Sequence, residues 1–131
     1  MRVGKKRKIK VLVVDNEKGF ASLLVDHLNL RQMEATSAGS GEEALAGLLS
    51  FQPDVILLDL QMPGMDGLKV LARVKELDPA VEVILLTGNG SFDTGIACMQ
   101  LGAFDYLIKP VDIEQLMEII AGACQKNLSG R

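Results

Sequence analysis

Apolar and polar residues alternate in blocks along this chain, and each block has the period of a strand or a helix. Apolar runs at residues 9–14, 55–58, 83–86 and 105–108 have the length of strands, and residues 34–37 are expected to form a further short strand. Between these runs, apolar residues recur at helical spacing in segments that end near residues 31, 49, 77, 101 and 127. The pattern predicts five strands that alternate with five helices.

Capping residues mark where three of the helices begin. Ser40 opens an S-x-x-E capping box, and Asp112 opens one of the D-x-x-Q kind. Asp66 precedes the third helical pattern and is its predicted N-cap. Strands and helices joined by short links specify an α/β fold, a doubly wound parallel sheet with helices on both faces. Right-handed crossovers leave few topologies, of which we expect the flavodoxin-like strand order 2-1-3-4-5.

Polar residues follow the strands at their carboxyl ends. The central strand runs into Asp59, the first ends before Asp15 and Asn16, the fourth delivers Thr87 and the fifth delivers Lys109. In the order 2-1-3-4-5 these ends lie side by side, at the edge where open parallel sheets bind ligands. Asp59 could instead cap the next helix, but a Pro/Gly loop separates the two.

Together these side chains have the chemistry of a phosphoryl-transfer site. Asp15, Asn16 and Asp59 offer the hard oxygen ligands that Mg²⁺ prefers. Lys109 and Thr87 supply a positive charge and a hydroxyl for phosphate oxygens. A carboxylate, a metal, a lysine and a hydroxyl are the parts needed to transfer a phosphoryl group onto Asp59. Each residue alone is weak evidence for such a site, so the specificity of the prediction comes from four strand ends that meet at one place.

Composition and charge narrow the classes of function. No apolar run approaches the roughly 20 residues of a membrane span, and the basic start MRVGKKRKIK lacks the apolar segment of a secretory signal. We therefore expect a cytoplasmic protein. Residues 1–10 hold six Lys or Arg and no acid, which leaves eight basic against seventeen acidic residues elsewhere. Such an acidic body argues against direct nucleic-acid binding, and the tail is expected to be solvated.

The chain resembles the receiver domains of bacterial two-component response regulators over about residues 8–128. The motifs VVDNE, DLQMPGMDG, LLTGNG and LGAFDYLIKP, with their spacing, carry the resemblance. It implies a receiver domain at residues 9–128, between a basic tail at 1–8 and a C-terminal tail at 129–131. Such a domain is a phosphoacceptor switch and not an enzyme in the ordinary sense, although it promotes its own phosphotransfer and dephosphorylation.

The resemblance also implies roles for the metal and phosphoryl groups. Asp59 would be the phosphoacceptor, and Asp15 and Asn16 would occupy the positions of the acidic pair. The backbone carbonyl of Gln61 would complete the Mg²⁺ ligands. Asn16 replaces an acidic residue, which predicts weaker Mg²⁺ binding but not its loss, because an amide oxygen is still a hard ligand. Gln61 and Asn89 fall at positions that tune dephosphorylation, and amides cannot act as general bases, so we expect a persistent phosphoryl group.

A switch follows from the same resemblance. Thr87 would be the switch hydroxyl, Tyr106 the switch aromatic, and Lys109 would pair with phosphate next to a cis bond to Pro110. Phosphorylation would change the surface of the fourth helix, fifth strand and fifth helix. The implied partners are a sensor histidine kinase or phosphotransfer protein and an output domain, with a weak similarity to receivers fused to ATPase-type transcription activators. A homodimer through the fourth and fifth helices is a further expectation.

Three other functions stay open at this point. A pseudo-receiver would keep the fold as a phosphorylation-independent binding module, and Asn16 is the feature that favours it. A phosphatase with an aspartate nucleophile usually carries D-x-D, whereas Gln61 stands at the second acidic position here. A flavodoxin-like electron carrier shares the fold, but Asp15, Asn16 and Glu17 make a poor cradle for a flavin phosphate.

Overall fold

The computed structural model describes residues 7–62, 66–88 and 92–129. Over these residues strands and helices alternate as predicted. At most of their ends, the observed boundary differs from the expected one by one or two residues. The elements are β1 (Lys10–Val14), α1 (Lys18–Leu30), β2 (Glu34–Ala38), α2 (Gly41–Ser50), β3 (Val55–Asp59), α3 (Gly67–Leu77), β4 (Glu82–Thr87), α4 (Phe92–Gln100), β5 (Asp105–Ile108) and α5 (Ile113–Ser129).

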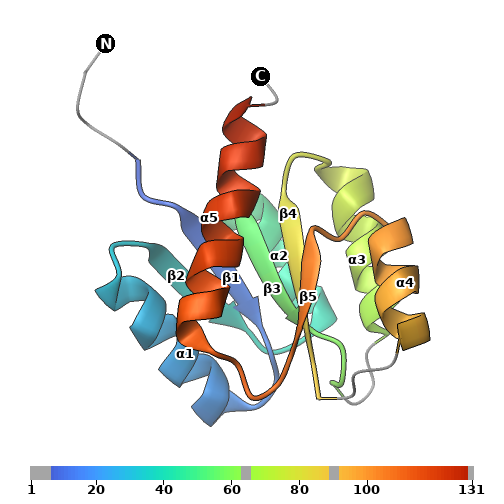
Figure 1. The fold of residues 1–131 in the computed structure, drawn as a ribbon, viewed down its shortest axis with the longest axis horizontal. Coiled ribbons are helices and arrows are strands. Elements are labelled where there is room, and N and C mark those ends of the chain that lie inside the picture. The colour runs from blue at the N-terminus through green and yellow to red at the C-terminus, as the bar shows by residue number, and fades with distance from the viewer. Residues whose placement is uncertain (1–6, 63–65, 89–91, 130–131) are drawn as a thin grey trace.

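The described strands form one parallel sheet in the order β2-β1-β3-β4-β5, which confirms the predicted topology. The central strands β3 and β4 are buried along their whole length, as continuous apolar runs require. Figure 1 shows the strands with their carboxyl ends gathered at the lower edge, whereas the start of β1 and the end of α5 lie at the opposite edge. Asp15, Asp59, Thr87 and Lys109 therefore share one edge of the sheet.

Side chains of alternate strand residues divide the core into two layers. Val11, Val13 and Leu57 belong to the layer beneath α1 and α5, whereas Leu12 and Leu58 belong to the layer beneath α2, α3 and α4. The ribbon shows α1 and α5 together in front of the sheet (Figure 1). This alternation decides which helices each residue at a strand end can reach.

The helix caps confirm the three predicted starts. The Ser40 hydroxyl accepts from the Glu43 N–H at 3.1 Å, while the Glu43 carboxylate accepts from the Gly39 N–H at 2.7 Å. Asp66 accepts from the first N–H groups of α3, and Asp112 does the same for α5. These caps satisfy backbone donors that have no partner within the helix.

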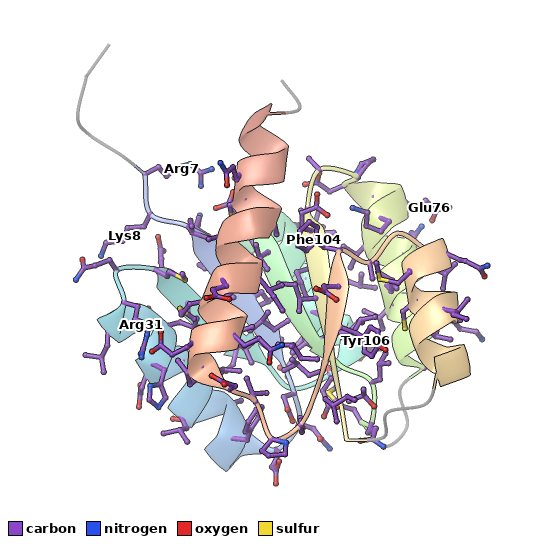
Figure 2. All side chains as sticks on the ribbon, viewed as in Figure 1. Arg7, Lys8, Arg31, Glu76, Phe104 and Tyr106 are labelled. Atoms are coloured by element: carbon purple, nitrogen blue, oxygen red, sulfur yellow. The ribbon has the colours of Figure 1, made fainter. Side chains whose placement is uncertain are left out.

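The basic tail is less free than expected, because its last part is fastened to the sheet. Arg7 makes two hydrogen bonds of 2.9 Å to the Asp54 carboxylate just before β3, which also accepts from the Lys10 N–H at 2.8 Å. Burial alone would raise the pKa of Asp54, but the hydrogen bonds from Arg7 and Lys10 outweigh it and hold that pKa below its ordinary value. Figure 2 shows Arg7 at the edge of the molecule opposite the strand ends.

Two further observations concern membrane spans and the cysteines. Among the described residues, no helix is long and apolar enough to cross a bilayer. Cys98 is fully buried in the layer beneath α4, and Cys124 is half-buried against the layer beneath α5. Both thiols are free, and Cys98 fills the core whereas Cys124 lies at its margin.

Candidate functional site

Lys109 lies between the two carboxylates at the carboxyl edge of the sheet. Its Nζ atom is 3.1 Å from Asp15 Oδ2 and 3.4 Å from Asp59 Oδ2. The Asp15 and Asp59 side chains are only 0% and 6% exposed, against 22% for Lys109. Burial would lower the pKa of Lys109, but its hydrogen bond to Asp15 and the charges of Asp59 and Asp15 raise that pKa above the ordinary value. Lys109 is therefore a positively charged group that the two carboxylates hold in place.

The second oxygen of each carboxylate is held by the backbone two residues further along. Asp15 Oδ1 accepts from the Glu17 N–H at 2.8 Å, and Asp59 Oδ1 accepts from the Gln61 N–H at 2.9 Å. Asp59 thus does not cap α3, a role that belongs to Asp66. Glu17 itself stands at the N-cap of α1 without a side-chain cap bond. Both carboxylates present a fixed oxygen to the same lysine.

Phe20 also holds Lys109, a contact that sequence reasoning missed. The Lys109 Nζ atom lies 4.5 Å from the centre of the Phe20 ring, within the range of a cation–π attraction. The sheet explains this meeting, because β3 and β5 residues of this parity face the layer covered by α1, the helix that carries Phe20. The one signal in the sequence was that Phe20 belongs to the apolar face of its helix.

Thr87 and Tyr106 belong to the opposite side of the sheet. Thr87 shares its parity along β4 with Val83 and Leu85, which face α4, and Tyr106 packs against the same layer. Thr87 is 4% exposed and Tyr106 is half-buried. The Tyr106 ring lies against Gly95 of α4, so close that an added Cβ would come within 3.0 Å of it. Strand alternation therefore places both predicted switch residues on the α4 side.

The Lys109–Pro110 peptide bond is cis, as the resemblance implied. Directly before it, the Lys109 N–H donates to the Thr87 carbonyl at 2.8 Å and joins the end of β5 to that of β4. The fifth strand therefore reaches the edge at the same level as the fourth, and Lys109 points back across the sheet to Asp59 and Asp15.

Two further predicted residues, Gln61 and Asn16, lie beside this cluster. Gln61 is exposed, and its side-chain oxygen accepts from the Gly88 N–H at 2.7 Å, a contact that no sequence pattern indicated. Asn16 is exposed directly beside Asp15 in the chain. Asn89 lies outside the described residues, so its predicted role stays a prediction. The structure brings both Asp15 and Asp59 into contact with Lys109.

The oxygen ligands available here fit a magnesium ion, although only two of them come from carboxylate side chains. Two buried carboxylates, Asp15 and Asp59, face a single ammonium group, so negative charge exceeds positive in the cluster and favours a cation. The side chain of Asn16 and the backbone carbonyl of Gln61 would supply neutral oxygens. In the described part of the chain, no three His, Cys, Asp or Glu side chains gather as a metal site.

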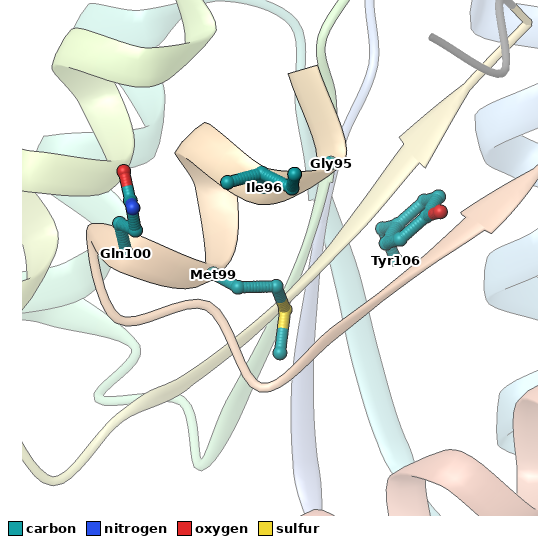
Figure 3. Close-up of a pocket in the computed structure, with 5 residues that line it drawn as sticks. All are labelled: Gly95, Ile96, Met99, Gln100 and Tyr106. Atoms are coloured by element: carbon teal, nitrogen blue, oxygen red, sulfur yellow. The ribbon is translucent and has the colours of Figure 1, made fainter. Parts of the chain in front are cut away.

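A groove beside α4 lies apart from the charged cluster. Gly95, Ile96, Met99 and Gln100 of α4, with Tyr106 of β5, line a space of about 360 Å³. Figure 3 shows the Tyr106 ring and the Met99 side chain beside α4. Ile96 and Met99 are 42% and 45% exposed, so the chain presents an apolar strip here that borders the predicted switch residue.

Comparison with protein families identifies the family of this chain. Residues 11–121 match the family of the response regulator receiver domain. The chain belongs to this family. Receiver domains of this kind act in two-component signalling as phosphoacceptor switches, and the fold described above is that of such a receiver.

Individual relatives show how far the similarity extends. The chain is 39% identical over 113 residues to the DNA-binding transcriptional regulator NtrC of Salmonella typhimurium, covering 86% of this chain and 24% of that protein. It is 34% identical over 111 residues to sporulation initiation phosphotransferase F of Bacillus subtilis, covering 85% of this chain and 90% of that one. This receiver thus spans about a quarter of NtrC but most of the phosphotransferase.

Among solved structures, the receiver domain protein of Clostridium thermocellum has the same fold. The two share 32% of their residues with a TM-score of 0.88, and the match covers 94% of this chain and 99% of that one. The layers and the carboxyl edge of the sheet are therefore common to both proteins.

Proposed function

We propose that this receiver accepts a phosphoryl group onto Asp59 from a phosphohistidine of a sensor kinase or phosphotransfer protein. The contact between Lys109 and both carboxylates carries this proposal, because it fixes a cation beside a buried nucleophilic oxygen. A carboxylate oxygen of Asp59 would attack phosphorus, the P–N bond would break as the P–O bond forms, and the departing imidazole would take up a proton. Lys109 would balance charge on the phosphoryl oxygens.

Magnesium would bind at the same edge and neutralise phosphoryl charge during transfer. We propose Asp15, Asp59, Asn16 and the Gln61 carbonyl as its ligands. Lys109 and the Thr87 hydroxyl would hold the phosphoryl group. Lys109 already reaches from the end of β5 to the end of β3, and Thr87 stands at the end of β4. The amide at Gln61 has no basic group with which to activate water, so the acyl phosphate would be slow to hydrolyse.

The output would pass through the α4–β5–α5 surface. Phosphorylation adds about −1.5 to −2 charge at the edge, and Thr87 would move toward it. Tyr106 packs on the same side of the sheet and would follow by turning inward past Gly95. That movement would reshape the apolar strip at Ile96 and Met99, where we propose that an output domain, an ATPase-type activator among the candidates, or a second copy binds.

Intact mass spectrometry after incubation with acetyl phosphate and Mg²⁺ tests the central step. We expect the wild type to gain one phosphoryl group and Asp59→Asn to gain none. Asp26→Asn, which changes an exposed carboxylate of α1, is the matched control and should behave as wild type. No addition to wild type at any Mg²⁺ concentration would reject the proposal and favour a phosphorylation-independent binding module, the function to which Asn16 points.

A further inference from the structure

The side chain of Gln61 joins two loops that flank Asp59. Its Oε1 atom accepts from the Gly88 N–H at 2.7 Å, while its own backbone N–H donates to Asp59 Oδ1 at 2.9 Å. One residue thereby connects the predicted phosphoacceptor with the first residue after β4. A hydrogen bond of this length is well formed, although both residues are exposed.

Gly88 is the first residue after β4, and it lies outside the hydrogen-bonded sheet. The Leu60 N–H donates to the Leu86 carbonyl at 3.0 Å, and the Lys109 N–H donates to the Thr87 carbonyl at 2.8 Å. These bonds fix β4 from both neighbouring strands as far as Thr87. Beyond that point, the bond to Gln61 is the contact that the Gly88 N–H makes, and its acceptor is a side chain able to turn away.

The absence of a side chain at position 88 permits this approach. A Cβ atom built on Gly88 would lie 2.6 Å from Gln61 Oε1, well inside van der Waals contact. Any other residue at position 88 would therefore push the Gln61 amide away from the Gly88 N–H. The chain thus carries two separate features, a glutamine at 61 and a glycine at 88, on which the contact depends.

We propose that the Gln61 side chain is a latch that holds the Gly88 amide in the unphosphorylated protein and must release it to the phosphoryl group on Asp59. The inference rests on the proposed function and adds a regulator to that site. A phosphoryl oxygen is a charged acceptor and forms a stronger bond to an N–H than a neutral amide oxygen does. Gln61 is therefore a positioning residue that favours the resting state and opposes the switched one.

The resting contact can be tested without metal or phosphate. Amide hydrogen exchange measured by NMR should find the Gly88 N–H protected in wild type and faster to exchange in Gln61→Met, which keeps the length but lacks the acceptor. Gln61→Glu retains an acceptor oxygen and should restore protection. Gln115→Met on α5 is the matched control for losing an exposed glutamine amide. Equal exchange at Gly88 in wild type and Gln61→Met would overturn the latch.

Release can be tested by titration with beryllofluoride, a noncovalent phosphoryl mimic, at a saturating concentration of Mg²⁺. Gln61→Met should bind it about twofold to tenfold more tightly than wild type, the range that one net hydrogen bond represents. Gly88→Ala should have a similar effect by excluding the Gln61 oxygen. Because both substitutions remove the same hydrogen bond, the double variant should bind beryllofluoride little more tightly than either single variant.

The outcomes separate the latch from the function on which it rests. Tight binding by wild type with unchanged affinity in Gln61→Met and Gly88→Ala would overturn the latch and leave the phosphoacceptor role intact. Strictly additive gains from the two substitutions would also count against it, since a shared bond can be lost once only. Failure of every variant to bind beryllofluoride would overturn the proposed function, and the release step with it.

Discussion

Removing the ammonium group of Lys109 should destabilise the resting receiver and make its stability depend on Mg²⁺. Lys109→Met keeps an unbranched apolar stem over the Phe20 ring and deletes the charge that lies 3.1 and 3.4 Å from the two carboxylates. Two buried carboxylates would then repel each other without a cation between them. The variant tests whether Lys109 is the resting counter-ion of the site.

The size of the effect follows from the distances and the burial. Opposite unit charges 3.1 Å apart attract by about 5 kcal/mol at an effective dielectric of 20. The hydration that Lys109 recovers on unfolding offsets part of this, and breaking a buried pair costs roughly 3–5 kcal/mol. Because the lysine side chain is 22% exposed to screening water, we expect a loss of about 2–3 kcal/mol.

Urea unfolding with and without Mg²⁺ measures this loss. At about 1–3 kcal/mol per molar urea, the midpoint of Lys109→Met should fall by roughly 1 M without the metal. Mg²⁺ should restore more stability to the variant than it adds to wild type, because a bound cation replaces the missing charge. Lys69→Met, which removes an exposed lysine of α3, is the matched control and should change little.

A second substitution separates charge from packing. Adding Asp15→Asn to Lys109→Met removes one of the two repelling carboxylates, so the double variant should be more stable than Lys109→Met alone. If Lys109→Met unfolds at the urea concentration of the wild type, or if Mg²⁺ stabilises both proteins equally, Lys109 is not the counter-ion and the electrostatic account is wrong.

Three further predictions concern the metal, the switch and the thiols. Asn16→Asp adds a carboxylate beside Asp15 and should bind Mg²⁺ at least tenfold more tightly by calorimetry, a modest part of the roughly 4 kcal/mol ceiling for a charge at about 4 Å; equal affinities would contradict it. Tyr106→Ala should leave phosphorylation of Asp59 unchanged while weakening binding of an output partner, and loss of phosphorylation by mass would refute that assignment. Burial, aided by the Asp54 carboxylate, raises the pKa of Cys124 to about 11, so its reaction with iodoacetamide should be slow at pH 8 and rise steeply toward pH 11; rapid labelling of folded protein at pH 8 would disprove this.

The sequence by itself determined the fold and the composition of the site. Strand-length apolar runs and helical spacing specified an α/β sheet because each pattern buries a face only in its own geometry. Asp59, Thr87 and Lys109 could be picked out because each directly follows a strand-length run in the sequence, and parallel strands must end at one edge. The caps at Ser40 and Asp112 were equally local, since a cap depends on residues within one turn.

Only the tertiary structure decided which of these groups touch and what else reaches them. Lys109 meets both carboxylates, and Phe20 covers it, because strand parity turns it toward α1, a helix almost ninety residues earlier in the chain. The bond between Gln61 and Gly88, and that between Arg7 and Asp54, join segments far apart in sequence. Such contacts depend on register and on the relative height of strand ends, which no local pattern records, because they arise only when the whole sheet is assembled.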